Sequence, residues 1–237
     1  MAALYLAMWS GPRNLSTALM RSFGSRPDAF VCDEPLYAHY LKVTGRPHPG
    51  ADEVIADQDN DWESVANWLT GPIPNGRSVF YQKHMAHHLL DRVGRDWLTG
   101  LTHAFLIRNP TDMLTSLLKV FPEAVLLDTG LPQQVAIFDE IGGPVIDSRD
   151  LAEHPEPILR QLCERIGLDF QPSMLEWPPG PRDTDGIWSR HWYARVEDTT
   201  GFVPFRDHDR VVPDDKQDVY EACLPLYEHL YSHRLKP

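Results

Sequence analysis

The chain has 237 residues, 42% of them hydrophobic, and it carries 22 lysine and arginine residues against 34 aspartate and glutamate residues. A chain of this length can bury a sizeable core, and we predict one α/β domain over 1–237. The formal net charge of -12 argues against a general nucleic-acid binder. Any anion site must therefore be locally basic.

Cysteine usage and apolar runs predict a cytoplasmic protein without a membrane partner. Cys32, Cys163 and Cys223 lie far apart and have no C-x-x-C spacing, which fits a reducing compartment. The apolar N-terminal stretch lacks a basic flank and is too short for a signal peptide. No run approaches the roughly 20 apolar residues of a membrane-spanning helix. The sequence leaves the oligomeric state open.

The first predicted unit is a strand over 3–8, a polar loop and a helix over 15–23. Unpaired backbone N–H groups and the helix dipole attract anions to the start of such a helix. The alternative is an ordinary helix cap beside a solvated arginine. The common nucleotide loop G-x-x-x-x-G-K-[ST] would require a second glycine and a lysine that are absent here. We predict an anion site formed by Ser10, Gly11, Pro12, Arg13, Asn14, Leu15, Ser16 and Thr17.

Further strands and helices are predicted to alternate along the chain, which is typical of a doubly wound parallel sheet. Two stretches without clean periodicity, 44–61 and 171–200, are predicted to be loops beside the site. Within the second, 188–195 is a candidate lid over a bound base. The predicted strands are 29–32, 78–82, 104–107 and 144–146, and the predicted helices are 36–41, 62–69, 111–121, 132–141, 156–166 and 214–234.

Polar residues follow several of these strands. Ligands of doubly wound sheets bind beyond the carboxyl ends of the strands, where we expect Arg13, Glu34, Lys83, His84 and Arg108 to meet.

A second candidate anion motif runs from Arg108 to Ser116. Arg108 ends a strand and can bind a phosphate through its planar guanidinium group. Ser116 follows two helical turns later and can donate a hydroxyl to the same anion. The alternative is an ion pair beside an ordinary helical serine.

Three motifs in this order resemble the sulfotransferase family. Residues 10–17 are similar to the family's 5'-phosphosulfate loop, with Arg13 where many members carry lysine. Residues 108–116 are similar to its 3'-phosphate motif R-[ND]-P-x-x-x-x-x-S, and Asp150-Leu151 with Pro155 resembles a later segment. The resemblance implies a P-loop NTPase-like three-layer sandwich with a mainly parallel five-stranded sheet. It also implies 3'-phosphoadenosine 5'-phosphosulfate as the sulfuryl donor and a small-molecule acceptor.

The resemblance also implies catalytic roles. Sulfuryl transfer needs a base for the acceptor's proton, and Glu34 and His84 are both candidates. Glu34-Pro35 resembles the E-P of some members, and Lys83-His84 resembles the K-x-H of others but is one residue shorter. Arg13 cannot donate a proton as lysine can, but it can stabilise charge on the leaving phosphate.

No metal is expected. His84, His87 and His88 have helical spacing, yet no carboxylate stands in a ligand pattern beside them.

The sequence is also compatible with two other functions. A phosphotransferase or hydrolase that uses ATP would share the fold and would depend on magnesium. A nucleotide-binding module without turnover would keep the anion pocket alone. Similar sequences also occur fused to aminotransferase-like modules, but nothing here indicates a pyridoxal-phosphate lysine.

Overall fold

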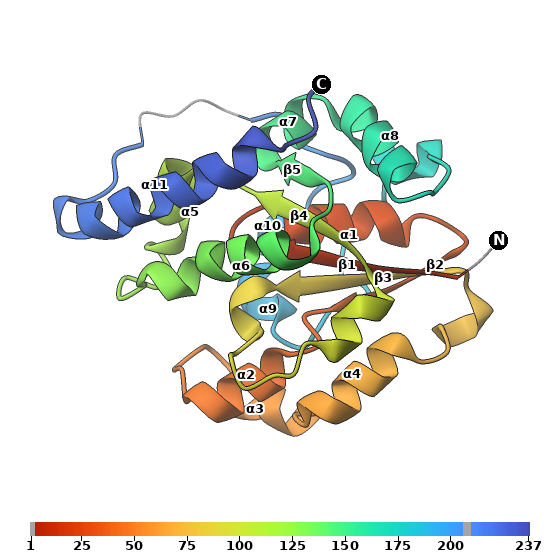
Figure 1. The fold of residues 1–237 in the computed structure, drawn as a ribbon, viewed down its shortest axis with the longest axis horizontal. Coiled ribbons are helices and arrows are strands. Elements are labelled where there is room, and N and C mark those ends of the chain that lie inside the picture. The colour runs from red at the N-terminus through yellow and green to blue at the C-terminus, as the bar shows by residue number, and fades with distance from the viewer. Residues whose placement is uncertain (1–2, 206–209) are drawn as a thin grey trace.

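One central sheet of five parallel strands organises residues 3–205 and 210–237, which the computed structural model describes. The strand order is β2-β3-β1-β4-β5, so the first strand lies in the middle; the chain passes from β1 to the edge strand β2, returns to β3 beside β1, and then continues on the other side of β1 with β4 and β5 (Figure 1). This is the predicted α/β architecture, with every strand pair parallel. The strands are β1 Leu4–Ser10, β2 Ala29–Asp33, β3 Val79–Met85, β4 Thr102–Ile107 and β5 Val145–Asp147.

Helices cover both faces of this sheet. The α-helices are α1 Ser16–Gly24, α2 Tyr37–Thr44, α3 Ala51–Asp57, α4 Trp62–Thr70, α5 Pro110–Leu117, α6 Leu131–Ile141, α7 Ser148–Glu153, α8 Pro155–Arg165, α9 Ser189–Trp192, α10 Ala194–Glu197 and α11 Gln217–Ser232. Short 3₁₀ turns join them, among them η2 Ala86–His88 and η4 Leu126–Thr129. None of the helices in 3–205 and 210–237 is long and apolar enough to cross a membrane.

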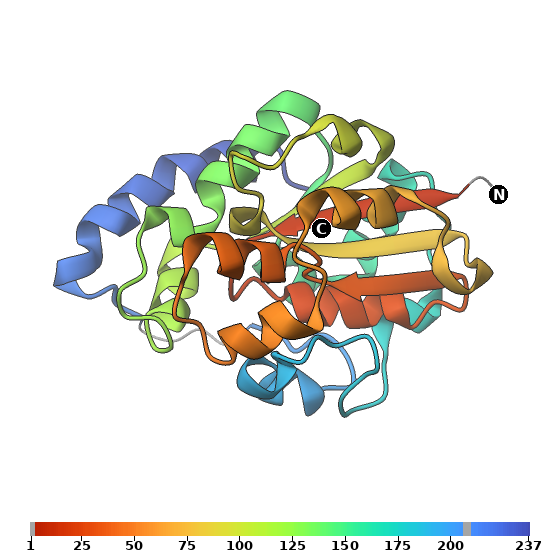
Figure 2. The same cartoon turned by 90° about the horizontal axis from the view of Figure 1, so that it is seen from below.

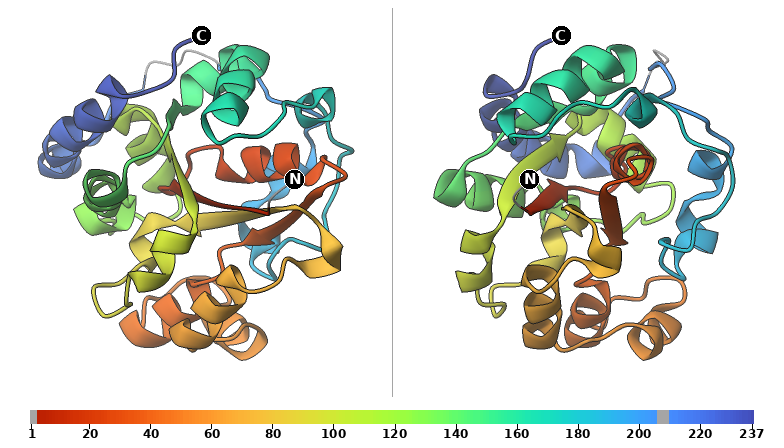
Figure 3. Two further views of the ribbon diagram at one scale, coloured as in Figure 1. Left: turned by 45° about the vertical axis from the view of Figure 1, so that its right-hand side comes forward. Right: turned by 90° about the vertical axis from the view of Figure 1, so that its right-hand side faces the viewer.

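The two faces of β1 build two separate cores, because successive strand residues point to opposite sides. Leu6 and Met8 pack with apolar residues of α1, α7 and α8. Ala7 and Trp9 pack with apolar residues of α4, α5, α6 and α11. Figure 3 shows the sheet between these helical layers. The result is the three-layer sandwich that the resemblance implies.

A third, smaller apolar cluster ties the C-terminal part of the chain to α2 and α3. Tyr37 and Tyr40 of α2 and Val54 of α3 pack with Trp188 and Tyr193. In Figure 2 the blue segment that contains α9 and α10 lies beside the orange helices α2 and α3. We call residues 186–197 the strap, because this segment packs on α2 and α3 although it lies far from them in sequence.

The structure corrects several predicted boundaries. The predicted loop 44–61 contains α3, a seven-residue helix too short for its periodicity to stand out. The helix predicted over 111–121 ends at Leu117, and the one predicted over 214–234 begins at Gln217 after a 3₁₀ turn. The stretch 171–200 contains the four-residue helices α9 and α10. The third strand continues to Met85 instead of ending at Gln82, which matters for the site.

Candidate active site

A cleft of about 860 Å³ lies at the carboxyl end of the sheet, where sequence reasoning placed the site. Its walls come from the loop after β1, the end of β3, helix α5, the 44–61 stretch and the strap. One end is lined by arginines, and the other by carboxylate, tyrosine and histidine side chains. We call these the arginine end and the carboxylate end.

The loop after β1 curls around the start of α1. Arg13 and Leu15 adopt left-handed backbone conformations, with φ of 63° and 66°, which are uncommon for residues other than glycine. The fold holds the loop in place: Asn14 Nδ2 donates to the Leu106 carbonyl at 3.2 Å, and Ser148 Oγ donates to the Asn14 carbonyl at 2.8 Å. Leu15 is the N-cap of α1 and its side chain offers no cap. The first N–H groups of α1 therefore remain available to an anion.

Gly11 serves packing instead of facing the cleft. A Cβ added there would lie 2.3 Å from the Thr129 carbonyl oxygen, so η4 can approach the loop only if this residue is glycine. Ser10 is also buried, and its hydroxyl contacts the His84 carbonyl at 3.4 Å. Neither residue borders the cleft, whereas the other predicted loop residues do: Pro12, Arg13, Asn14, Leu15, Ser16 and Thr17.

The two predicted anion motifs meet directly. Arg13 Nε donates a hydrogen bond to Ser116 Oγ at 3.0 Å, which joins the loop after β1 to α5. Arg108, at the end of β4, donates from its guanidinium to the Arg13 carbonyl. The Nε of Arg108 is buried and has no partner among the described residues. Loop, strand end and helix thus form one cationic wall.

Among residues 3–205 and 210–237, no carboxylate forms an ion pair with Arg13 or Arg108, and the neighbouring guanidinium groups repel one another. Burial lowers the pKa of Arg13, and the nearby Arg195 lowers it further. The pKa of Arg108 falls to about 10, chiefly through burial, with Arg210, Arg13 and Arg195 adding to the effect against Asp112. Arg195 reaches the cleft from the strap. A bound anion would relieve this repulsion, so the site fits a ligand with more than one negative group.

A buried ionic network forms the carboxylate end. The Nζ of Lys83 donates to Asp33 Oδ1 at 2.7 Å, to Glu34 Oε1 at 2.6 Å and to the Tyr193 hydroxyl at 2.7 Å. Tyr193 in turn donates to Asp33 Oδ2 at 2.7 Å. Every ammonium proton of Lys83 has an acceptor, although the residue is only 1% exposed. The network anchors the strap to β2 and β3.

The network keeps one carboxylate at the cleft. Burial opposes the charge on Lys83, but Asp33 and Glu34 raise its pKa well above the ordinary value, so the ammonium persists. Burial raises the pKa of Glu34, while Lys83 acts against that shift. Glu34 also has a left-handed backbone, with φ of 43°. Its backbone N–H donates to the Lys83 carbonyl at 2.9 Å, which holds the residue at the cleft wall.

His84 lies away from the cleft, which corrects its expected place beside Glu34. Because β3 continues to Met85, Lys83 and His84 are consecutive strand residues and point to opposite faces. His84 stacks on Trp9 with ring centroids 4.4 Å apart, in the core beneath α4. Its ring shares a 3.2 Å hydrogen bond with Gln82 Oε1. Burial lowers the pKa of His84 to about 3, so the ring stays neutral there.

Several cleft residues have no signal in the sequence motifs. Tyr37, Tyr40, His48, His87 and His88 form the wall around Glu34. They come from α2, from the stretch before α3 and from η2, and only the fold brings them together. The sequence analysis considered His87 and His88 only as metal ligands and did not place them in this wall.

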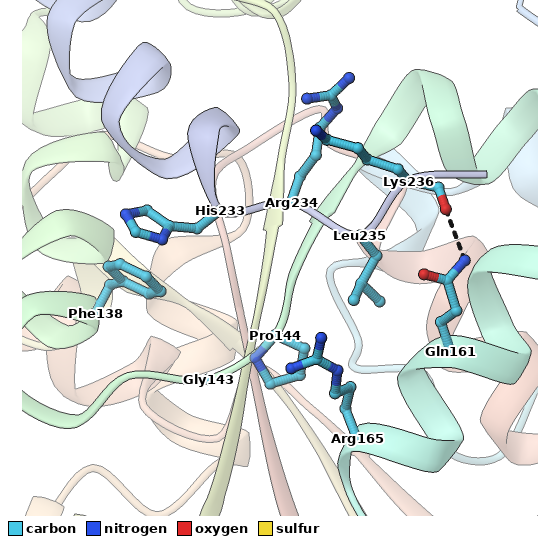
Figure 4. Close-up of a pocket in the computed structure, with 9 residues that line it drawn as sticks. All are labelled: Phe138, Gly143, Pro144, Gln161, Arg165, His233, Arg234, Leu235 and Lys236. Atoms are coloured by element: carbon cyan, nitrogen blue, oxygen red, sulfur yellow. Dashed lines mark hydrogen bonds between the residues drawn. The ribbon is translucent and has the colours of Figure 1, made fainter.

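A second, smaller cavity of about 630 Å³ opens beside the start of β5, away from the carboxyl ends of the strands (Figure 4). Structural contacts occupy two of its polar side chains: Gln161 donates to the Lys236 carbonyl at 2.7 Å (Figure 4), and Arg234 pairs with Asp150 at 2.9 Å. Among the described residues no group of three or more histidine, cysteine, aspartate or glutamate side chains could hold a metal ion.

Comparison with known proteins adds a family and a fold. A family model described as a sulfotransferase domain matches residues 4–234. Among solved structures, the sulfotransferase domain from the curacin biosynthetic pathway is similar over 100% of this chain and 99% of its own, with a TM-score of 0.56 and 14% identity. A sulfotransferase from Alicyclobacillus acidocaldarius is similar over 99% and 98%, with a TM-score of 0.55 and 14% identity. At such identities these likenesses establish the fold.

Two curated relatives carry a different name. Branched-chain-amino-acid aminotransferase-like proteins 1 and 2 of Arabidopsis thaliana are 39% and 37% identical to this chain. Each match covers 95% of the chain but only 41% of the relative. The chain therefore spans well under half the length of these proteins.

Proposed function

The chain belongs to the sulfotransferase-domain family and is a transferase of that class, and from this premise we propose that it uses 3'-phosphoadenosine 5'-phosphosulfate as sulfuryl donor. The acceptor would be a hydroxyl or amine of a small molecule. The observation that carries the proposal is the hydrogen bond between Arg13 and Ser116, which unites two anion motifs in one wall of the cleft. A donor with separate 5' and 3' anionic groups matches a wall built from two motifs.

The residues of the arginine end fit that donor. Arg13, Ser16, Thr17 and the first N–H groups of α1 would bind the 5'-phosphosulfate, as the helix start offers open donors. Arg108 and Ser116 would bind the 3'-phosphate, and the Nε of Arg108, which has no partner in the described part of the chain, could donate to it as well. Arg13 would also stabilise charge that develops on the leaving phosphate.

The carboxylate end would hold the acceptor. Glu34 lines the cleft there, and Lys83 fixes one of its two oxygens at 2.6 Å. We assign the acceptor's proton to this end of the cleft, since a base must lie opposite the leaving group of an in-line transfer. His84 has no part in this assignment, because it lies in the core.

We attribute the aminotransferase-like name of the plant relatives to the part of those proteins that this chain does not match. Lys83 is the buried lysine of the described residues, and its ammonium is held by Asp33, Glu34 and Tyr193. A lysine so paired would not serve as a Schiff-base amine, which must shed its proton.

Three separate buried cysteines favour a cytoplasmic setting for the transferase.

Isothermal titration calorimetry tests the donor. We expect 3',5'-bisphosphoadenosine to bind at least about tenfold more tightly than AMP, without a requirement for magnesium, because the extra phosphate gains charge-assisted hydrogen bonds. Ser116→Ala should reduce this preference, because it should weaken the binding of 3',5'-bisphosphoadenosine more than that of AMP. Equal affinity for the two nucleotides, or binding of ATP only with magnesium, would overturn the proposal.

A further inference from the structure

We propose that His88 is the base that takes the acceptor's proton, and that Glu34 is a positioning residue that orients the imidazole; this rests on the sulfuryl-transfer function proposed above. The sequence motifs point only to Glu34 and His84. The geometry around η2 instead supports His88 as the base and Glu34 as the residue that orients it.

The free oxygen of Glu34 faces His88. Lys83 holds Oε1 at 2.6 Å, whereas Oε2 lies 4.0 Å from the Nδ1 of His88. The Lys83 contact lowers the proton affinity of the carboxylate, and the Glu34 side chain is only 12% exposed. Glu34 is thus placed to accept a hydrogen bond from a ring N–H, after a closure of about 1 Å to ordinary hydrogen-bond length.

His88 needs such a partner. Its Nδ1 is buried and has no hydrogen-bond partner among the described residues, which is costly for a polar atom. Glu34 Oε2 is the carboxylate oxygen that faces it. If Nδ1 carries the proton and donates to Glu34, the lone pair of the imidazole lies on Nε2. His88 borders the cleft, so this lone pair is available to an acceptor.

Two tyrosines fix the plane of the ring. The Tyr37 ring stacks on His88 with centroids 4.7 Å apart and an interplanar angle of 4°. The Tyr40 ring stacks on it at 4.6 Å and 28°. A ring held in this way can rotate little. Burial and the neighbouring histidines and Lys83 also lower the pKa of His88 well below its usual range, so the free ring is unprotonated at neutral pH.

The proton and electron balance is simple. As the acceptor oxygen or nitrogen forms its bond to sulfur, the bond from sulfur to the bridging oxygen breaks, and its electron pair leaves with 3',5'-bisphosphoadenosine. The acceptor's proton passes to the Nε2 of His88. The resulting imidazolium keeps its Nδ1–H toward Glu34, whose charge stabilises it. The proton then returns to solvent.

Nitrogen-15 NMR of the histidine side chains tests the orientation without any acceptor. In the wild-type protein we expect His88 as the neutral tautomer with the proton on Nδ1, and Glu34→Gln should shift or mix that tautomer. The His39 signals should not change, because that ring bonds the Asn60 carbonyl through Nδ1 at 3.0 Å, outside the cleft. A wild-type His88 protonated on Nε2 would overturn the proposal.

Hydrolysis of 3'-phosphoadenosine 5'-phosphosulfate, with water as the acceptor, tests catalysis. His88→Asn keeps an amide donor toward Glu34 but removes Nε2, so the hydrolysis rate should fall about 10²-fold or more, while the Kd of 3',5'-bisphosphoadenosine stays within about threefold. His39→Asn is the matched control and should keep the full rate. An unchanged rate in His88→Asn would overturn the inference, whereas a wild type that fails to bind 3',5'-bisphosphoadenosine would overturn the proposed function instead.

Discussion

The two ends of the cleft solve opposite electrostatic problems. At the arginine end, Arg13, Arg108 and Arg195 repel one another, and the pKa values of Arg13 and Arg108 are lowered. At the carboxylate end, Asp33 and Glu34 share one buried lysine, whose pKa is raised. A ligand that carries negative charge would compensate the first end, whereas the second is already paired within the fold. We therefore expect substitutions at the arginine end to weaken ligand binding, and substitutions at the carboxylate end to lower the stability of the fold.

The largest expected effect is on stability, at the carboxylate end. Lys83→Met leaves two buried carboxylates without a cation, and we expect the free energy of unfolding to fall by about 3–5 kcal/mol in urea titrations. Lys42→Met is the control, since its Nζ bonds Asn60 at an exposed site and should cost less than about 0.5 kcal/mol. Equal stability of the two variants would show that the network is not a structural anchor.

The next effect is on binding, at the arginine end. Arg108→Ala removes a guanidinium whose Nε has no partner within 3–205 and 210–237, so 3',5'-bisphosphoadenosine should bind on the order of 10- to 100-fold more weakly by calorimetry. The Tm without ligand should hardly change, because relief of the repulsion among the arginines offsets the loss of the hydrogen bond from Arg108 to the Arg13 carbonyl. Arg160→Ala, which breaks a surface pair with Glu156, should bind as the wild type does. A large drop in Tm with normal affinity would show that Arg108 stabilises the fold and does not bind the ligand.

A smaller effect concerns the pH dependence of stability. The pKa of His84 is about 3 in the folded protein, against about 6.5 in an unfolded chain. Below pH 6.5 the unfolded chain binds a proton that the folded protein does not, so stability falls as pH decreases toward 3. His84→Phe should reduce the slope of unfolding free energy against pH by about 1.4 kcal/mol per unit in this window. An unchanged slope would mean that His84 is not buried and neutral.

The smallest expected effect concerns the strap. Tyr193→Phe removes the hydroxyl that bonds Lys83 and Asp33, and we expect a loss of about 1 kcal/mol. Hydrogen exchange of residues 186–197 should become faster, while exchange in β1 is unaffected. Tyr220→Phe is the control, because that hydroxyl makes no hydrogen bond to the described residues and the change should be neutral. Slow exchange in both variants would contradict anchoring through Tyr193.

The contrast between the two ends also explains what the sequence could predict. The arginine end is built from contiguous motifs, and a strand followed by a helix start fixes the position of Arg13 and Ser16 from local pattern alone. The predicted alternation of strands and helices likewise led to the parallel sheet. The contact between Arg13 and Ser116 then follows from the neighbouring positions of β1 and β4.

Only part of the carboxylate end has such a local origin: Glu34 and Lys83 follow predicted strands and meet as expected, but the groups around them could not be placed from the sequence. The position of His84 depends on where β3 ends, and a difference of three residues moved its side chain from the cleft into the core. Tyr193 reaches Lys83 from 110 residues away, through a segment without clean periodicity. Contacts between distant segments without a shared motif appear only once the chain is folded.

The strap has a consequence for attempts to change what the protein accepts. Tyr193 belongs to the ionic network, and Arg195, two residues later, faces the arginine end. A substitution that shifts the strap therefore perturbs both halves of the cleft together. Pro47, His48 and Pro49 border the cleft from a separate stretch of chain. Libraries that aim at new acceptors should vary this stretch and leave the strap intact.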